Sequence, residues 1–228
     1  EARTSSRSIP HGPTADDELV ARVSEAITRY AGPNADGGLL VVAGPGPLFG
    51  AEFLEGVVRG LGGALLADPL SGARYAKNGG GGVVTHYDPA MRDPEVREAL
   101  RPGLVIRLGG APSSAVLLEA LESWSDVPQL IFRADGRLHD QWGLASEHHA
   151  VDGVDLLSRF PTATVTEYRD RWTRVEKAVR DAAGEIPDDF LEGWNARTVL
   201  SAAPEGSMVC VSASMPIRVG AAVGGPAG

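Results

Sequence analysis

Short apolar runs alternate with longer amphipathic stretches along most of the chain. The clearest runs are residues 39–43, 64–67, 104–108 and 129–132, each four or five residues long and almost entirely apolar. Continuous runs of this length are typical of parallel strands that helices bury on both faces. A weaker run at residues 163–165 is a candidate for a short fifth strand.

Helices are predicted between these strands, where apolar residues recur every three or four positions. The first is expected to begin at a capping box formed by Thr14 and Asp17 and to end at Gly32. Ser113 and Ser114 are expected to cap a helix that follows the third apolar run. Three further predicted helices cover residues 53–61, 168–184 and about 190–203.

This alternation predicts the α/β class, with a doubly wound and mostly parallel sheet flanked by helices. We expect residues 1–13 to be an interdomain linker and residues 14–187 to form one doubly wound α/β domain. Residues 188–228 are then the beginning of a further α/β domain, truncated after a strand at residues 206–211. The glycine-rich residues 73–88 are expected to form a mobile loop.

Composition narrows the possible partners and locations. The net charge of -9 has the wrong sign for nucleic acid or an anionic membrane surface as the main partner. No apolar run reaches the ~18 residues that span a bilayer, and the polar start is unlike a signal peptide. The only cysteine, Cys210, falls inside the last apolar strand, which excludes a disulfide framework and a cysteine-ligated zinc site. We therefore expect a cytoplasmic protein, and we interpret the chain as a fragment of a longer one.

A glycine loop at residues 44–50 follows the first strand, and Asp68 ends the second. This arrangement is typical of a dinucleotide site, in which the loop binds the pyrophosphate and the acid binds a ribose. However, the spacing is G-x-G-x-x-x-G, and Pro45 and Pro47 remove backbone N–H donors that such a loop needs. A tight turn that packs a helix on the sheet is the favoured interpretation, with a nucleotide- or effector-binding module as the alternative.

Two places in the chain are candidate anion sites. Ser113 and Ser114 lie at a helix N-terminus, where free N–H groups favour an anion, although ordinary N-capping explains the same residues. Ser214 and Arg218 follow the last predicted strand, where ligands of parallel sheets are found. An arginine fork suits a carboxylate, but it could equally be tied to the backbone of a neighbouring domain.

No residue is assigned as catalytic or as a metal ligand from these patterns. Adjacent His148 and His149 point apart, and His139-Asp140 has no further ligand at suitable spacing, so these are expected to be surface or loop histidines. Asp188-Asp189 is expected to cap the helix that follows it.

Several motifs in order resemble one family, the 2-succinyl-5-enolpyruvyl-6-hydroxy-3-cyclohexene-1-carboxylate (SEPHCHC) synthases of menaquinone biosynthesis, which are thiamine-diphosphate enzymes. The resemblance covers about residues 15–219 of a three-domain enzyme. It implies that residues 14–187 are its dinucleotide-binding-like, Rossmann-like central domain and that residues 188–228 are the truncated beginning of its C-terminal, diphosphate-binding domain. It rests on Val-Val-Ala-Gly-Pro-Gly at 41–46, Ala-Asp-Pro-Leu-Ser-Gly at 67–72, Tyr-Asp at 87–88, Leu-Val-Ile-Arg-Leu-Gly at 104–109, Asp-Gly-Arg at 135–137, the helix of Trp172, and Ser-Met-Pro-Ile-Arg at 214–218.

The resemblance implies a transferase that decarboxylates 2-oxoglutarate and adds the resulting unit to isochorismate. It implies thiamine diphosphate and Mg²⁺ (or Mn²⁺) as cofactors of a full-length enzyme that is a homodimer or homotetramer. Ser214 and Arg218 match the serine and arginine with which the family binds substrate. The cofactor-binding motifs belong to the first domain and to the remainder of the third, so we expect this chain alone to bind no cofactor and to be inactive.

Three positions depart from the family pattern. Ala115 stands where the family often has a substrate-facing lysine, Ala213 replaces an asparagine, and Val219 replaces an aspartate. These changes keep open a related thiamine-dependent carboligase that uses another acceptor.

Overall fold

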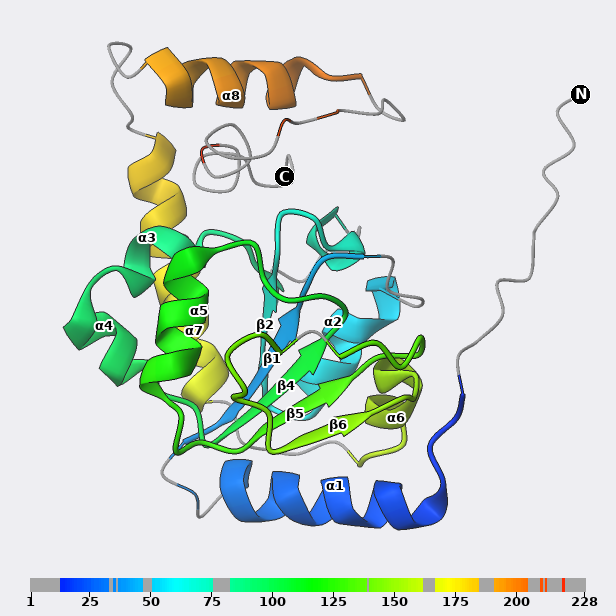
Figure 1. Ribbon diagram of the computed structural model, residues 1–228. Coiled ribbons are helices and arrows are strands. Elements are labelled where there is room, and N and C mark those ends of the chain that lie inside the picture. The colour runs from blue at the N-terminus through cyan, green and yellow to red at the C-terminus, as the bar shows by residue number, and fades with distance from the viewer. Residues whose placement is uncertain are drawn as a thin grey trace, which may run out of the picture.

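The computed structural model describes residues 13–32, 35, 37–46, 51–75, 83–138, 140–161, 167–184, 191–204, 210, 212 and 219. Within them, six strands form one wholly parallel sheet in the order β3-β2-β1-β4-β5-β6 (Figure 1). This confirms the predicted doubly wound α/β fold, and the four strongest apolar runs form the central strands. The strands are β1 Leu39–Ala43, β2 Ala64–Ala67, β3 Val83–Val84, β4 Leu104–Leu108, β5 Gln129–Phe132 and β6 Glu147–His149.

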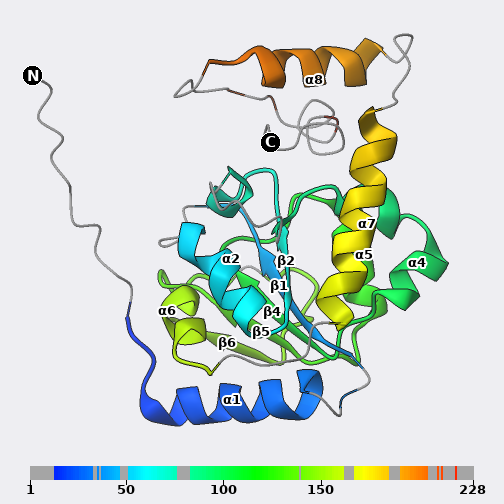
Figure 2. The same cartoon turned by 180° about the vertical axis from the view of Figure 1, so that it is seen from behind.

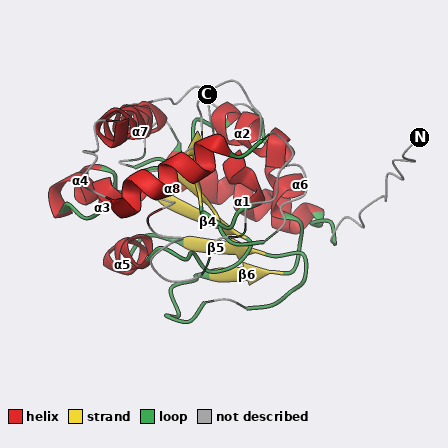
Figure 3. Ribbon diagram, turned by 90° about the horizontal axis from the view of Figure 1, so that it is seen from above, coloured by secondary structure: helices red, strands yellow, loops and turns green. Residues whose placement is uncertain are grey.

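Helices cover both faces of the sheet, as the view from above shows (Figure 3). Helices α1, α2 and α6 pack on one face, and α3, α5 and α7 pack on the other. Seen from behind, α2 lies on one side of the sheet and α7 on the other (Figure 2). The helices are α1 Asp17–Ala31, α2 Ala51–Gly60, α3 Tyr87–Met91, α4 Pro94–Ala99, α5 Ala115–Ser123, α6 Gly153–Ser158, α7 Glu167–Gly184 and α8 Leu191–Ala202, with a short 3₁₀ helix, η1, at Gly72–Tyr75.

Strand periodicity divides the hydrophobic core into two clusters. In β1, Leu39 and Val41 belong to the cluster under α1, α2 and α6, whereas Leu40 and Val42 belong to the cluster under α3, α5 and α7. Successive side chains of a strand point to opposite faces, so a strand between two helical layers must be apolar at every position. This is why the continuous apolar runs predicted these strands correctly.

The start of α1 differs from the predicted capping box. Its N-cap is Asp16, whose Oδ1 accepts a hydrogen bond from Leu19 N at 2.8 Å. Thr14 lies two residues before this cap and outside the helix. The carboxylate satisfies a free N–H of the first turn and also complements the positive end of the helix dipole.

Ordered elements also occupy parts of the segment predicted to be a mobile loop. Within residues 73–88 the chain forms most of η1, all of β3 and the start of α3. Tyr87 and Met91 of α3 are buried. The prediction was wrong for these residues because glycine content says nothing about the apolar contacts that Val84, Tyr87 and Met91 make with the core.

Some of the predictions cannot be compared with the described structure. Residues 163–165 and 188–189 lie outside the described residues. The division between a central domain and a following domain at residue 187 stays a prediction. Among the helices in the described part of the chain, none combines the length and apolar character needed to cross a membrane.

Candidate functional site

The carboxyl ends of β1, β2 and β4 bring together the loops that the sequence marked as candidate chemistry. The strand order runs outward from β1 to β3 on one side and from β4 to β6 on the other, so the chain reverses direction between β1 and β4. In doubly wound sheets this reversal opens the crevice where ligands bind. Gly44–Gly46 from β1, Asp68 from β2 and Ser113 from the β4 connection all lie at this edge.

Within the described part of the glycine loop, residues 44–46, the backbone donors are already used within the protein. Gly44 N donates to Leu108 O at 2.8 Å, and Gly46 N donates to Leu70 O at 3.2 Å. Pro45 has no N–H, and its carbonyl accepts from Gly110 N at 2.8 Å. A Cβ on Gly44 would lie 1.9 Å from the carbonyl oxygen of Gly110, so glycine is needed for this close approach. The N–H groups of Gly44 and Gly46 are therefore not free for a pyrophosphate, and this part of the loop packs closely against the β4 connection.

The Asp68 carboxylate is fully buried and also used internally. Its Oδ2 accepts from Ser113 N at 2.6 Å and from Ser113 Oγ at 2.9 Å, while Oδ1 accepts from Leu70 N at 2.9 Å. Three hydrogen bonds compensate the cost of burying this charge. Asp68 therefore joins the β2 and β4 connections and is not placed to bind a ribose.

Ser114 joins a second aspartate to the same helix terminus. Its Oγ accepts from Leu117 N at 3.1 Å as the N-cap of α5 and donates to Asp88 Oδ1 at 2.5 Å. Asp88 also pairs with Arg92, at 3.0 Å. Ser113 and Ser114 thus each hold a carboxylate of this chain at the N-terminus of α5. Binding of an external anion by these two residues stays a prediction.

A cavity of about 190 Å³ lies beside these loops, at the ends of β1, β4 and β5. Gly46 and Gly109 form one side of it, and Arg133, Asp135 and Asp152 contribute its charged groups. Arg133 donates to both carboxylate oxygens of Asp135, at 2.8 Å and 2.5 Å, and these hydrogen bonds hold the pKa of Asp135 well below its usual range. The ion pair of Arg133 and Asp135 is therefore part of the cavity lining.

A buried ion pair secures the long connection between β5 and β6. Arg107 Nη1 of β4 lies 3.0 Å from Asp140 Oδ1, and both side chains are less than a tenth exposed. Asp140 Oδ2 also accepts from Ala145 N at 2.8 Å. Burial favours the neutral carboxyl, but the hydrogen bonds from Ala145 and Arg107 outweigh it, and the pKa of Asp140 is lowered. Asp140, considered above only as a possible metal ligand, is thus the partner of a strand arginine.

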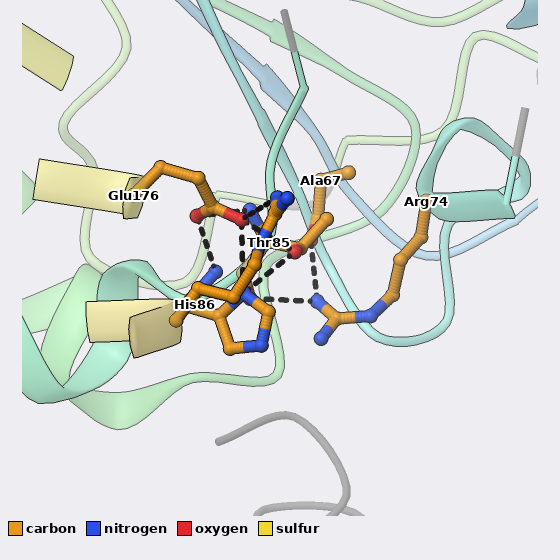
Figure 4. A network of polar contacts seen from close by, with 6 residues as sticks. Ala67, Arg74, Thr85, His86 and Glu176 are labelled. Atoms are coloured by element: carbon orange, nitrogen blue, oxygen red, sulfur yellow. Dashed lines mark hydrogen bonds and ion pairs between the residues drawn. The ribbon is translucent and has the colours of Figure 1, made fainter. Parts of the chain in front are cut away.

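A buried polar cluster around Glu176 was not anticipated from sequence (Figure 4). Glu176 of α7 accepts from the backbone N–H groups of Thr85 and His86, at 2.9 Å and 2.8 Å. It also accepts from Thr85 Oγ1 at 3.0 Å and from Arg180 at 2.9 Å, and His86 Nδ1 lies 2.9 Å away. Arg74 extends the cluster by donating to the Thr85 carbonyl at 2.9 Å. Through these hydrogen bonds Glu176 connects α7 to the residues that directly follow β3.

The hydrogen bonds to Glu176 make the fold sensitive to acid. Burial favours its neutral form, but hydrogen bonds from His86 and Arg180 prevail and lower its pKa from 4.5 to about 2. A folded-state pKa below the unfolded value stabilises the protein above pH 4.5, and this stabilisation is lost as pH falls from 4.5 to 2. We expect Glu176→Gln to lower the free energy of unfolding by roughly 2–3 kcal/mol at pH 7 and by roughly half of that at pH 3.

Urea unfolding at both pH values measures this difference. Asp181→Asn is the matched control, because Asp181 forms only an exposed pair with Lys177 on the same helix. A loss at pH 3 as large as that at pH 7 would contradict the assigned role of the Glu176 charge.

The adjacent histidines lie on an edge strand and not in a loop. His148 and His149 belong to β6, where His149 stacks on Phe132 with ring centroids 5.4 Å apart. His149 Nε2 also lies 2.7 Å from Glu147. No three His, Cys, Asp or Glu side chains in the described ranges are grouped to hold a metal ion. The pattern failed to predict this strand because it is short and polar.

The predicted substrate-binding pair cannot be placed. Ser214 and Arg218, together with Ala213, lie outside the described residues. Cys210 is described, and it is exposed and not part of a strand. The predicted strand position of Cys210 was therefore wrong. An apolar run becomes a strand only where a neighbouring strand supplies hydrogen bonds, and Cys210 pairs with none of the six strands.

Sequence comparisons find curated relatives with one shared name. The chain is 29% identical over 161 residues to the SEPHCHC synthase of Bacillus pumilus, which is 68% of this chain and 28% of that protein. It is 33% identical over 177 residues to that of Myxococcus xanthus, 74% of this chain and 29% of the relative. For Halobacterium salinarum the identity is 31% over 210 residues, 88% of this chain and 34% of the relative.

These matches confirm the resemblance inferred from the ordered motifs. No family model matches the chain. The chain spans about a third of the length of the curated relatives it matches.

Proposed function

We propose that this chain, which is similar to about a third of the length of SEPHCHC synthases, is the central segment of such an enzyme in menaquinone biosynthesis. The observation that carries this proposal is the similarity over 68–88% of the chain to relatives that share this one name. The full-length protein would be a cytoplasmic transferase, a homodimer or homotetramer, that joins a unit from decarboxylated 2-oxoglutarate to isochorismate.

The carboxyl edge of the sheet supports this proposal over a nucleotide-binding module. The N–H groups of Gly44 and Gly46 donate to protein carbonyls, and the Asp68 carboxylate accepts hydrogen bonds from Ser113 and Leu70. A dinucleotide site would need these groups free for the pyrophosphate and the ribose. The glycine loop thus serves as a structural turn, as in a central domain that keeps the fold without the nucleotide.

The described residues do not fit a thiamine diphosphate and metal site. No trio of metal-binding side chains is grouped in the described ranges, and the N–H groups of Gly44 and Gly46 already donate to protein carbonyls. We therefore assign the cofactors to other parts of the full-length enzyme and derive no catalytic step from this segment. Its own residues would support the neighbouring domains, and Ser214 and Arg218 would contact the substrate carboxylate or hydroxyl groups through charge-assisted hydrogen bonds.

An assay of the full-length gene product tests the proposal. With thiamine diphosphate and Mg²⁺ it should consume 2-oxoglutarate in an isochorismate-dependent reaction. Activity with a different acceptor and none with isochorismate would favour the related carboligase suggested by Ala115, Ala213 and Val219. The isolated chain should show no thermal stabilisation by NAD, FAD or ADP, and a saturable shift with any of these would favour the nucleotide-binding alternative.

The role of Arg218 can be tested in the same full-length enzyme. Arg218→Ala should raise the KM of a carboxylate substrate about tenfold or more, because it removes a charged donor from that anion. Steady-state kinetics measure this change, and Arg92→Ala, which breaks only an exposed pair with Asp88, is the control. An unchanged KM in the Arg218 variant would remove this residue from the site.

A further inference from the structure

A second and larger cavity lies at the opposite end of the sheet from the loops described above. Its volume is about 610 Å³, which is within the range of small-molecule sites. It lies where β1, β4 and β5 begin, and the residues around it include Gly37, Gly103 and Pro128. Neither the glycine loop nor Ser113 borders this cavity, so it is separate from the candidate site at the carboxyl edge.

Arginines from three different elements line this cavity: Arg29 in the last turn of α1, Arg101 just before β4, and Arg171 in the first turns of α7. Two carboxylates, Asp126 and Glu98, also line it. The described residues that line the cavity therefore carry one more positive than negative charge, in a chain whose own net charge is -9. A local excess of arginine on an acidic protein favours an anionic ligand at that place.

The present partners of these arginines leave donors free for a ligand. Arg101 uses Nη2 for both oxygens of Asp126, at 2.5 Å each, and makes no other hydrogen bond within the described residues. Arg171 donates Nη1 to the Ala99 carbonyl at 3.1 Å and lies 3.8 Å from Glu167. Within the described residues Arg101 is thus held through one nitrogen, whereas both Nη atoms of Arg171 are engaged.

Within the described residues, Arg29 uses the fewest of its N–H donors among the three arginines. It forms no ion pair within the described ranges, and its guanidinium lies over the Tyr30 ring, 5.2 Å from the centroid. Such stacking orients the guanidinium plane without using its N–H donors. The planar guanidinium can donate two parallel hydrogen bonds to a carboxylate or phosphate, and the neighbouring aromatic ring can contact the apolar part of a small organic ligand.

We propose that this arginine-lined cavity, defined by Arg29, Arg101 and Arg171, is a binding site for a small carboxylate- or phosphate-bearing molecule. Arg29 and Arg101 supply the free donors, and Tyr30 supplies an apolar wall. A ligand here would bridge α1, the start of β4 and α7. The proposal is independent of the catalytic function, because it concerns binding by this chain alone.

Isothermal titration calorimetry of the 228-residue chain tests the site with two probes, sodium pyrophosphate and sodium citrate, at constant ionic strength. We expect saturable one-to-one binding of at least one probe, and its identity distinguishes the phosphate class from the carboxylate class. The double variant Arg29→Gln with Arg101→Gln should weaken Kd at least tenfold. The matched control Arg92→Gln, which changes an exposed arginine paired with Asp88, should bind like the wild type.

Two results would overturn the proposal: no saturable binding of either probe, or binding that the double variant leaves unchanged. In the second case Ser113→Ala shows whether the anion binds at the N-terminus of α5 instead. Thermal unfolding of each variant confirms that it is folded. Arg29→Gln alone removes no ion pair of the described residues, so it keeps the test valid if the double variant is unstable.

Discussion

Replacing Trp172 with alanine is expected to lower the free energy of unfolding by about 3–5 kcal/mol, the range seen when a large aromatic side chain is deleted from a core. The Trp172 side chain of α7 is fully buried in the cluster that also contains Tyr168, one turn earlier. Its removal loses apolar contacts and leaves a cavity that the surrounding strands cannot close. Chemical denaturation at pH 7, followed by circular dichroism, measures the loss.

Trp142→Ala is the matched control for this change. Trp142 is 43% exposed on the connection between β5 and β6, so the same deletion should cost less than half as much. Equal losses in the two variants would show that Trp172 does not hold α7 against the sheet. If Trp172→Ala fails to fold, Trp172→Phe should fold with a smaller loss, because it keeps most of the buried volume.

The second large effect is expected at the buried pair of Arg107 and Asp140. Arg107→Met should cost about 3–5 kcal/mol, because it leaves the Asp140 carboxylate buried without its charged partner. The double variant Arg107→Met with Asp140→Asn should recover part of this loss, since the amide carries no charge and can still accept from Ala145 N. Urea unfolding of the two single variants and the double variant gives the coupling energy.

An exposed pair provides the comparison for Arg107. Arg22 and Glu147 form an ion pair at 3.4 Å in which both side chains are about half exposed. Arg22→Met should therefore change stability by no more than about 1 kcal/mol. A double variant no more stable than Arg107→Met alone would argue that the arginine acts through its packing and not through the charge of Asp140.

The central strands could be predicted from sequence because their pattern is local. Runs such as residues 39–43 and 104–108 are apolar at every position, and only a strand covered on both faces requires this. The shorter elements gave no such signal. Helices α3, α4 and α6 have five or six residues, too few for a helical period to repeat, and β6 has the polar sequence Glu-His-His.

The candidate site was only partly predictable. The proline residues of the glycine loop already argued against a dinucleotide site, and the hydrogen bonds of Gly44 and Gly46 agree with that interpretation. Ser114 was correctly expected at a helix cap. Arg107 gave one unused signal, since an arginine within an apolar strand must find a buried partner. Its partner, 33 residues further along the chain, could not be identified from that pattern.

The sequence by itself determined the α/β class, the central strands, the longer helices and the resemblance to SEPHCHC synthases, because each depends on residues that are neighbours in the chain. Only the tertiary structure decided how the polar groups are paired. Asp68 meets Ser113 across 45 positions, and Glu176 meets His86 across 90. A buried charge needs hydrogen-bond partners, and these come from whichever segments the fold places beside it. The order of the strands in the sheet places these segments together, and no local sequence pattern predicts that order.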